Sequence, residues 1–305
     1  MAIPTSRTKE PGSVTIDIEN CDGCGLCVKV CGDNTLVMSD GKAAVSDTPV
    51  FGCIGCGHCM AICPHDAIKV TGRTLSPDDL FTLPDSGEAA DYNQLLSLLK
   101  RRRSVREFQK RPVEPDVIEK ILAAAKTSPM GLPPSDVNVL IFDKVEKSRE
   151  FVTDFCKMLE RMKWFASPWF LALMRPFWGK ANDELFRNFI RPLFSIYPGN
   201  LKKGENSVTY DAPLVMYFYG SPWADPADPL IAAATAMYAG ESLGLGTCML
   251  GAVHPFIQNS GARRLREKYG IKYKCREGLL VIFGYPAVRY SKGIKRSFAS
   301  VTTYS

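Results

Sequence analysis

Two cysteine runs, Cys21-Asp-Gly-Cys-Gly-Leu-Cys-Val-Lys-Val-Cys31 and Cys53-Ile-Gly-Cys-Gly-His-Cys-Met-Ala-Ile-Cys63, decide the fold of the N-terminal part of this chain. They contain eight of its 11 cysteines, and both runs have the spacing C-x2-C-x2-C-x3-C. This is the ligand spacing of proteins that hold two 4Fe–4S clusters, in which the fourth cysteine of each run ligates the other cluster. The runs therefore predict two clusters with crossed ligand sets.

The crossing assigns each cluster three cysteines of one run and the last cysteine of the other. One set is Cys21, Cys24, Cys27 and Cys63, and the other is Cys53, Cys56, Cys59 and Cys31. Thiolates three residues apart on a tight loop can converge on one cluster when small residues separate them. We expect the glycines between the cysteines to let the backbone approach the cluster closely; they are Gly23, Gly25, Gly55 and Gly57.

Other uses of these cysteines fit less well. A disulfide framework requires an oxidising compartment, and the first residues show no signal peptide. Zinc takes its four ligands from two paired knuckles rather than from runs of four. One local departure concerns a turn: Pro64 follows the second run, whereas Gly32 follows the first. Proline is not a ligand, so the departure leaves the cluster assignment unchanged.

Charge divides the chain into two parts. Its 305 residues, 46% of them apolar, are enough for one large domain and one small domain. The net charge of +6 combines −7 over residues 1–91 with +13 over residues 92–305. Either the two parts dock electrostatically and the basic part binds an anionic cofactor or substrate, or most of these charges are solvated surface.

We expect a cytoplasmic protein with no membrane span and no nucleic-acid partner. The longest apolar candidate, residues 164–174, has 11 residues and ends at Arg175. A transmembrane helix needs about 18 to 20 apolar residues. The first ten residues contain no hydrophobic region of the kind that signal peptides have.

The rest of the chain interleaves helices and strands irregularly, which favours an α+β fold. Residues 1–13 are interpreted as a loose arm, residues 1–75 as the dicluster domain and residues 76–91 as a linker. Strands are expected at 14–18, 42–45, 137–142, 213–219 and 279–284, and helices at 92–103, 115–125, 146–163 and 229–243. Residues 92–305 are expected to form the second domain.

Residues 164–197 are rich in aromatic side chains and contain three of the four tryptophans. Helical core is the interpretation that we favour, closely followed by a lid over an aromatic substrate pocket. A membrane-interface patch ranks third. The aromatic residues are Trp164, Phe165, Trp169, Phe170, Phe177, Trp178, Phe186, Phe189, Phe194 and Tyr197.

Three segments of the second domain indicate a binding site. Arg102-Arg-Ser-Val-Arg106 follows a helix and offers guanidinium groups and a hydroxyl to a phosphate or a ring oxygen. The proline-rich loop 128–135 could lie flat against a planar ring. The third segment, Gly244-Leu-Gly-Thr-Cys-Met-Leu-Gly251, is followed by Gly284-Tyr-Pro286 and Lys295-Arg296. Its glycine spacing is not that of a dinucleotide fingerprint.

Together these segments give the chain two family resemblances. Residues 14–72 resemble bacterial-type ferredoxins with two 4Fe–4S clusters. Residues 92–305 resemble the nitroreductase family of FMN oxidoreductases, through Arg-Arg-Ser-Val-Arg, the Ser-Pro loop, Leu-Gly-Leu-Gly-Thr-Cys and Phe-Gly-Tyr-Pro followed by a distal arginine. The family's loop often continues with Asn and Gln-Pro-Trp, whereas here it reads Leu132-Pro-Pro-Ser-Asp-Val.

The second resemblance implies FMN at the interface of a homodimer. By position, Arg102, Ser104 and Arg106, with Arg103 between them, would hold the ribityl phosphate and the N1–O2 edge of the ring. The resemblance further implies that Pro129, Met130 and Gly131 pack on the ring, that Leu250 and Gly251 lie near N5, and that Lys295 and Arg296 grip the phosphate. No residue is assigned as the catalytic acid. His254 is interpreted as structural rather than as a proton donor.

The resemblances imply an oxidoreductase that passes electrons from the two clusters to FMN and then to a small organic acceptor such as a nitroaromatic. Other acceptors are enones, quinones and halogenated aromatics, and a non-catalytic electron carrier is the alternative of a different class. The donor is reduced ferredoxin, flavodoxin or NAD(P)H. Cysteines outside the two runs are expected to be small buried side chains; they are Cys156, Cys248 and Cys275.

Overall fold

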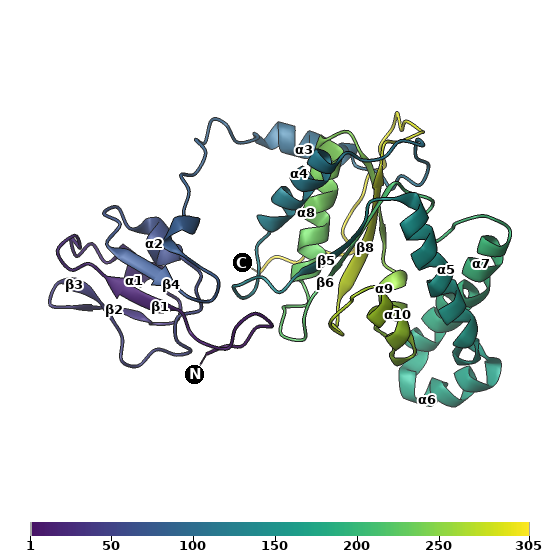
Figure 1. Cartoon of the computed structure of the whole chain (residues 1–305), viewed down its shortest axis with the longest axis horizontal. Helices are drawn as coiled ribbons and strands as arrows, with labels where there is room; N and C mark the ends of the chain where they lie inside the picture. The colour runs from purple at the N-terminus through teal and green to yellow at the C-terminus, as the bar shows by residue number, and fades with distance from the viewer. Residues whose placement is uncertain (1, 305) are drawn as a thin grey trace.

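The computed structural model describes residues 2–304, without the side chain of Trp178. Figure 1 shows a small N-terminal module beside a larger domain that is built on a sheet. The prediction for the side chain of Trp178 lies outside the described part of the chain. In the described part of the chain, no helix is long and apolar enough to cross a membrane.

The small module repeats one unit twice, as the internal duplication of the cysteine runs predicts. Strand β1 (Ser13–Ile16) pairs with β4 (Ile68–Thr71), and β2 (Leu36–Ser39) pairs with β3 (Lys42–Val45), both antiparallel. Helices α1 (Leu26–Val30) and α2 (His58–Ile62) each begin inside a cysteine run and contact one another. The short strand and the hairpin strand expected from the sequence are therefore present.

The larger domain has one antiparallel sheet of order β5-β6-β8-β7. Its strands are β5 (Asn138–Phe142), β6 (Leu214–Tyr219), β7 (Gly246–Leu250) and β8 (Gly278–Gly284). The central strand β6 is buried on both faces, because Leu214, Met216 and Phe218 enter one core and Val215 and Tyr217 enter the other. Such alternation follows from the two-residue period of a strand. The sheet and its flanking helices form an α+β fold, as expected.

Helices cover both faces of this sheet (Figure 1). On one face lie α4 (Pro115–Lys126) and α8 (Asp228–Ser242), whose alanines and isoleucines enter the core with β6 and β8. On the other lie α5 (Val145–Arg161), α7 (Arg191–Lys202), α9 (Val253–Gln258) and α10 (Arg263–Lys268). Helix α3 (Tyr92–Arg101) begins at a capping box between Asp91 and Gln94 and follows a segment with one short turn, η1 (Pro77–Asp79).

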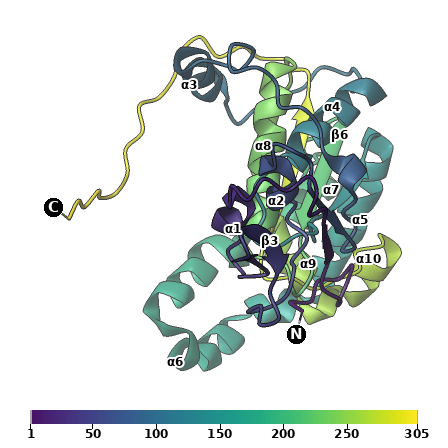
Figure 2. The same cartoon turned by 90° about the vertical axis from the view of Figure 1, so that its left-hand side faces the viewer.

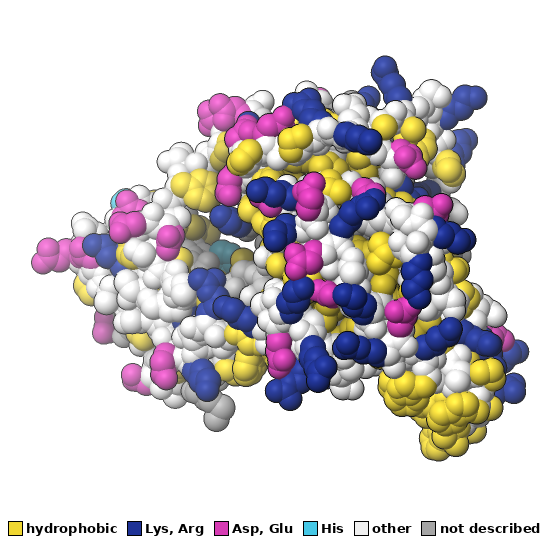
Figure 3. All heavy atoms as spheres, turned by 45° about the vertical axis from the view of Figure 1, so that its right-hand side comes forward, with side chains coloured by type: hydrophobic (Ala, Val, Ile, Leu, Met, Phe, Trp, Pro, Cys, Tyr) yellow, Lys and Arg dark blue, Asp and Glu magenta, His cyan; other side chains and the backbone are white. Residues whose placement is uncertain are grey.

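The aromatic segment is a helical excursion at the far end of the molecule from the small module (Figure 1). It comprises η2 (Lys163–Ala166), α6 (Pro168–Leu185), the π-helical turn η3 (Phe186–Ile190) and α7. Phe194 is buried, but Trp169, Phe177 and Phe189 are at least half exposed. A hydrophobic patch stands out at this end of the molecule in Figure 3. The interpretation as core therefore holds for Phe194 and for Phe165 and Tyr197, which pack against the same core. It is wrong for the exposed side chains Trp164, Trp169, Phe177 and Phe189.

Candidate functional site

Glycines in the left-handed conformation shape both cysteine runs. Gly25 and Gly57 precede α1 and α2 with φ angles of 69° and 75°, and Gly23 and Gly55 have φ angles of 78° and 69°. A side chain would be strained at each position. The final cysteine of each run, Cys31 or Cys63, then ends its helix. That these glycines let the backbone approach a cluster closely stays a prediction.

One cavity brings together four thiols from both runs. A cavity of about 280 Å³ is lined by Cys31 of the first run and by Cys53, Cys56 and Cys59 of the second. This is the crossed set predicted from the spacing. Within residues 2–304, no three His, Cys, Asp or Glu side chains converge closely enough to hold a single metal ion. Four thiols spread around a cavity suit a polynuclear cluster.

The electrostatics of these thiols also fit a cluster. Burial, together with the nearby Cys53, Cys56 and Cys31, raises the pKa of Cys59 to about 12. A buried thiolate is unfavourable unless a cation neutralises it, and iron supplies that positive charge. In the other predicted set, burial raises the pKa of Cys27, with Cys21 and Cys24 adding to the rise. Cys63 accepts a hydrogen bond from the N–H of Ala67 at 3.3 Å.

The N-terminal arm covers this cavity. Ile3 is one of its lining residues, and the N–H of Gly12 donates to the carbonyl oxygen of Cys53 at 2.7 Å. A Cβ atom on Gly12 would lie 3.1 Å from the Cys53 sulfur, so a larger residue would crowd the ligand. Ser6 binds both oxygens of the buried Asp136 in the larger domain. The interpretation of residues 1–13 as a loose arm is therefore wrong for the described residues 2–12.

The larger domain supplies another wall of the same cavity. Gly131 and Leu132 line it, and both belong to the proline-rich loop 128–135. The loop is anchored where the N–H of Gly131 donates to Oδ1 of Asp228 at 2.9 Å. Just before this wall, Pro129 and Met130 line a second cavity of about 190 Å³. The loop that resembles a flavin-packing loop thus lies directly against the predicted cluster.

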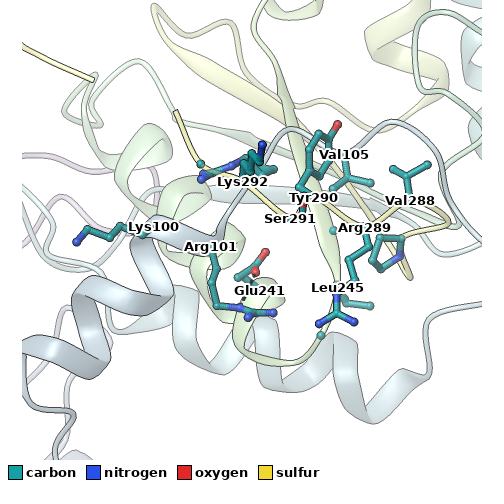
Figure 4. A pocket seen from close by; sticks show the side chains of 15 residues that line it. Lys100, Arg101, Val105, Glu241, Leu245, Val288, Arg289, Tyr290, Ser291 and Lys292 are labelled. Carbon is teal, nitrogen blue, oxygen red and sulfur yellow. Dashed lines mark ion pairs between the residues drawn. The ribbon is translucent and has the colours of Figure 1, made fainter. Parts of the chain in front are cut away.

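A basic cavity of about 550 Å³ is lined by residues from the C-terminal ends of α3 and α8 and from residues 286–293 (Figure 4). Glu241 is its one acidic lining residue, and Arg101 approaches this carboxylate at 3.7 Å. Five cationic side chains make the cavity suitable for a phosphate or another anion. They are Lys100, Arg101, Arg103, Arg289 and Lys292.

The segment Arg102–Arg106 lies along the edge of the sheet. Ser104 forms a parallel bridge with Thr247 of β7, and Val105 packs so closely on Gly246 that a Cβ there would lie 2.7 Å away. Arg103 lines the basic cavity, whereas the guanidinium of Arg106 lies 5.7 Å from the ring centroid of Tyr210. Of the predicted phosphate-binding residues in this segment, Arg103 alone lines the cavity.

The remaining predicted flavin residues lie at two other places. Leu250 ends β7, and Gly251 follows in an exposed turn before α9. Lys295 and Arg296 lie in the exposed segment 287–304, which extends away from the fold (Figure 2). Gly293 lies against the guanidinium of Arg103, where an added Cβ would be 2.4 Å from Nη2. Lys295 follows two residues later, within about 7 Å of chain.

Buried polar groups behind the sheet are structural. His254 is 4% exposed, and its Nδ1 lies 2.9 Å from the hydroxyl of Tyr217. Its Nε2 lies 3.2 Å from the carbonyl oxygen of Arg276. Burial lowers the pKa of His254, which favours the neutral ring. Cys156 and Cys248 are buried and Cys275 is partly buried, as expected of small core side chains.

Sequence reasoning missed Arg73. This residue is 5% exposed, and its guanidinium donates to Ile54 of the second cysteine run and to Pro133 of the larger domain, both at 2.8 Å. The isolated arginine had no motif around it. The signal available in the sequence was an arginine that follows the duplicated module directly. It lies in residues 1–91, whose net charge is negative.

The comparisons with known proteins match both parts. The nitroreductase family profile matches residues 99–285, and the profile of a 4Fe-4S dicluster domain matches residues 20–68. No curated protein matches the chain.

Solved structures with similar folds include a nitroreductase with bound FMN from Bacteroides fragilis NCTC 9343. It is 19% identical with a TM-score of 0.48, and the match covers 70% of this chain and 99% of that one. A nitroreductase with bound FMN from Desulfitobacterium hafniense DCB-2 is 18% identical with a TM-score of 0.47, covering 69% and 97%. An FMN-dependent nitroreductase from Clostridium difficile R20291 is 16% identical with a TM-score of 0.46, covering 70% and 100%.

Proposed function

The chain belongs to the nitroreductase family, and on that premise we propose that it passes electrons from two 4Fe–4S clusters through FMN to a small organic acceptor such as a nitroaromatic. One observation carries this proposal. The cavity of Cys31, Cys53, Cys56 and Cys59 has Gly131 and Leu132 of the larger domain in its wall. A cluster bound there would lie directly beside the loop that we assign to the flavin.

When bound, the clusters carry single electrons, and FMN stores two of them and delivers them to the acceptor. The residues of this chain bind and orient these groups. The two crossed cysteine sets hold the clusters. The basic cavity at Arg103, together with Arg102, Ser104 and Arg106, holds the phosphate and the polar edge of the ring. Lys295 and Arg296 reach the same region through the contact of Gly293 with Arg103.

The loop 128–135 has two roles in this proposal. Pro129, Met130 and Gly131 present few free N–H groups, which suits packing against a planar ring. The Gly131 N–H is already taken by Asp228, and Ser128 donates to the hydroxyl of Thr235 at 2.9 Å. These bonds hold the loop in place at the wall of the cluster cavity.

The second copy of a homodimer would complete the site. Segment 287–304 is exposed throughout and carries apolar side chains at Ile294, Phe298 and Val301, each about four-fifths exposed. Exposed apolar side chains that the rest of the chain leaves uncovered suit burial against a second copy. Truncation after Gly293 should convert a dimer into a monomer in analytical ultracentrifugation. A full-length chain that sediments as a monomer would contradict the dimer.

The choice between an enzyme and an electron carrier depends on a direct test. The full chain, reduced anaerobically with dithionite, would be mixed with nitroaromatic, enone and quinone acceptors. Multiple turnovers of one acceptor class, with an organic product, would support the enzyme. Reoxidation by a redox protein alone, with every small acceptor inert, would support the carrier.

A further inference from the structure

Arg73 joins three parts of the chain with one guanidinium. Its Nε donates to the carbonyl oxygen of Ile54 at 2.8 Å, inside the second cysteine run. Its Nη1 donates to Ile3 and Glu10 of the N-terminal arm at 3.1 and 3.0 Å, and its Nη2 donates to Pro133 at 2.8 Å. The four acceptors are neutral carbonyl groups. The side chain therefore ties the cluster-binding loop to the arm and to the flavin-domain loop.

The backbone at this position is held in an unfavourable conformation. Arg73 has a φ angle of 52° and Thr74 one of 64°, both in the left-handed region that non-glycine residues seldom adopt. Such strain persists where the surroundings fix it. The stem of Arg73 packs on Gly55, where an added Cβ would lie 3.1 Å from the Cβ of Arg73. Arg73 and Thr74 are the central residues of a tight turn, in which the N–H of Leu75 donates to the carbonyl oxygen of Gly72 at 2.9 Å, and the contacts of the Arg73 side chain add to this turn.

The charge of Arg73 lacks a direct partner among the described side chains, since none of their ion pairs includes it. Buried charges are normally paired. Asp136 is buried at the same junction, where its oxygens accept from Ser6 and Ser221, and its charge acts on Arg73 from beyond ion-pair distance, as does Cys53. Ile54 and Gly55, which Arg73 contacts, stand between the ligands Cys53 and Cys56. A cluster held by four thiolates is anionic and places further negative charge beside this guanidinium.

We propose that Arg73 is the counter-charge of the cluster held by Cys31, Cys53, Cys56 and Cys59, and that it favours the reduced state of this cluster. The inference rests on the clusters of the proposed function. One electron entering the cluster makes it more negative by one unit, so a buried cation raises its reduction potential. The same side chain fixes the cluster against the flavin-domain loop. Arg73 is thus a positioning residue for electron transfer between the modules.

The test compares substitutions in the anaerobically purified full chain. Arg73→Met should lower the midpoint potential of one of the two clusters. Electron paramagnetic resonance during a redox titration measures this potential. We expect a shift of about tenfold in the ratio of reduced to oxidised cluster at fixed potential, which is about 59 mV for one electron. Lys69→Met removes an exposed cation from β4 of the same module and should shift neither cluster.

Arg73→Lys tests the positive charge separately from the four hydrogen bonds of the guanidinium. It keeps the positive charge but not the four bonds, so the potential should stay near that of the wild type. Hydrogen exchange of residues 131–136 and 3–10 should become faster. If Arg73→Met fails to hold iron, Arg73→Gln carries the same comparison. An iron-loaded neutral variant with wild-type potentials for both clusters would overturn this inference, whereas a wild-type chain without iron would overturn the proposed function instead.

Discussion

The backbone N–H of Gly131 donates to Oδ1 of Asp228 at 2.9 Å, and this bond anchors the proline-rich loop 128–135 at the wall of the cavity that Cys31, Cys53, Cys56 and Cys59 line. Asp228 is 4% exposed, and burial raises the pKa of its carboxyl group. On its other side Gly131 lies against Asp225. The loop is therefore held at the wall of the cluster cavity with little freedom to move.

Replacing Gly131 with alanine should slow electron transfer from the clusters to the flavin. A Cβ there would lie 2.8 Å from the Cβ of Asp225, so the loop or Asp225 must shift, which disturbs the bond from Gly131 to Asp228. Overpacking of this kind costs about 1–3 kcal/mol of stability. Stopped-flow measurement of flavin reduction tests the expectation, with Gly87→Ala in open space as the control. Equal rates for the two variants would show that the loop position is unimportant.

Replacing Cys56 with alanine should remove one cluster and leave FMN bound. Cys56 lines the cavity with three other thiols, and nothing in its surroundings touches the basic cavity of the other domain. Iron should fall to about half, and flavin reduction by reduced ferredoxin should be lost. Cys275→Ala, which replaces a cysteine outside the runs, should keep both the full iron content and the reduction of the flavin. Loss of FMN from Cys56→Ala would contradict two separate modules.

Replacing Gly246 with alanine should weaken FMN binding. The new Cβ would lie 2.7 Å from Val105, whose neighbours Ser104 and Arg103 belong to the predicted phosphate site. Displacing this buried contact should also cost about 1–3 kcal/mol of stability. The dissociation constant for FMN, followed by flavin fluorescence, provides the measurement. Gly199→Ala, with no atom within 4 Å of its added Cβ, is the matched control, and similar affinities would argue against this placement.

His254 should make the larger domain less stable in mild acid. Its folded pKa lies below the unfolded value of about 6.5, because burial disfavours the charged ring. The unfolded state then binds more protons, so stability is present above about pH 6.5 and is lost as the pH falls below it. Thermal midpoints measured between about pH 5.5 and 8 should show this slope. The slope should flatten in His254→Gln. If the pH dependence persists in His254→Gln, groups other than His254 cause it.

Features that local chemistry determines were predictable from the sequence. The cysteine spacing and the intervening glycines specify a loop geometry within about ten residues. Helix α4 begins at Pro115, and β6 and β8 are continuous apolar runs, so these elements also agree with expectation.

Features set by long-range contacts were not predictable. Strand β7 contains Gly246 and follows Gly244, a sequence that suggests a turn, and its pairing with β8 makes it a strand. The N-terminal arm has no apolar periodicity, yet Ser6 and Asp136 hold it in place from positions 130 residues apart. The aromatic excursion had the composition of a core, but α6 projects from the domain and leaves Phe177 exposed.

The most direct measurement is the content of iron and flavin in the anaerobically purified full chain, read with its visible spectrum. The account predicts about eight irons and one FMN per chain, with the flavin bleached first on addition of limiting reductant. Eight irons without flavin would contradict the electron path from the Cys53 cavity across Gly131 to the flavin, and would leave a cluster protein that acts as a carrier.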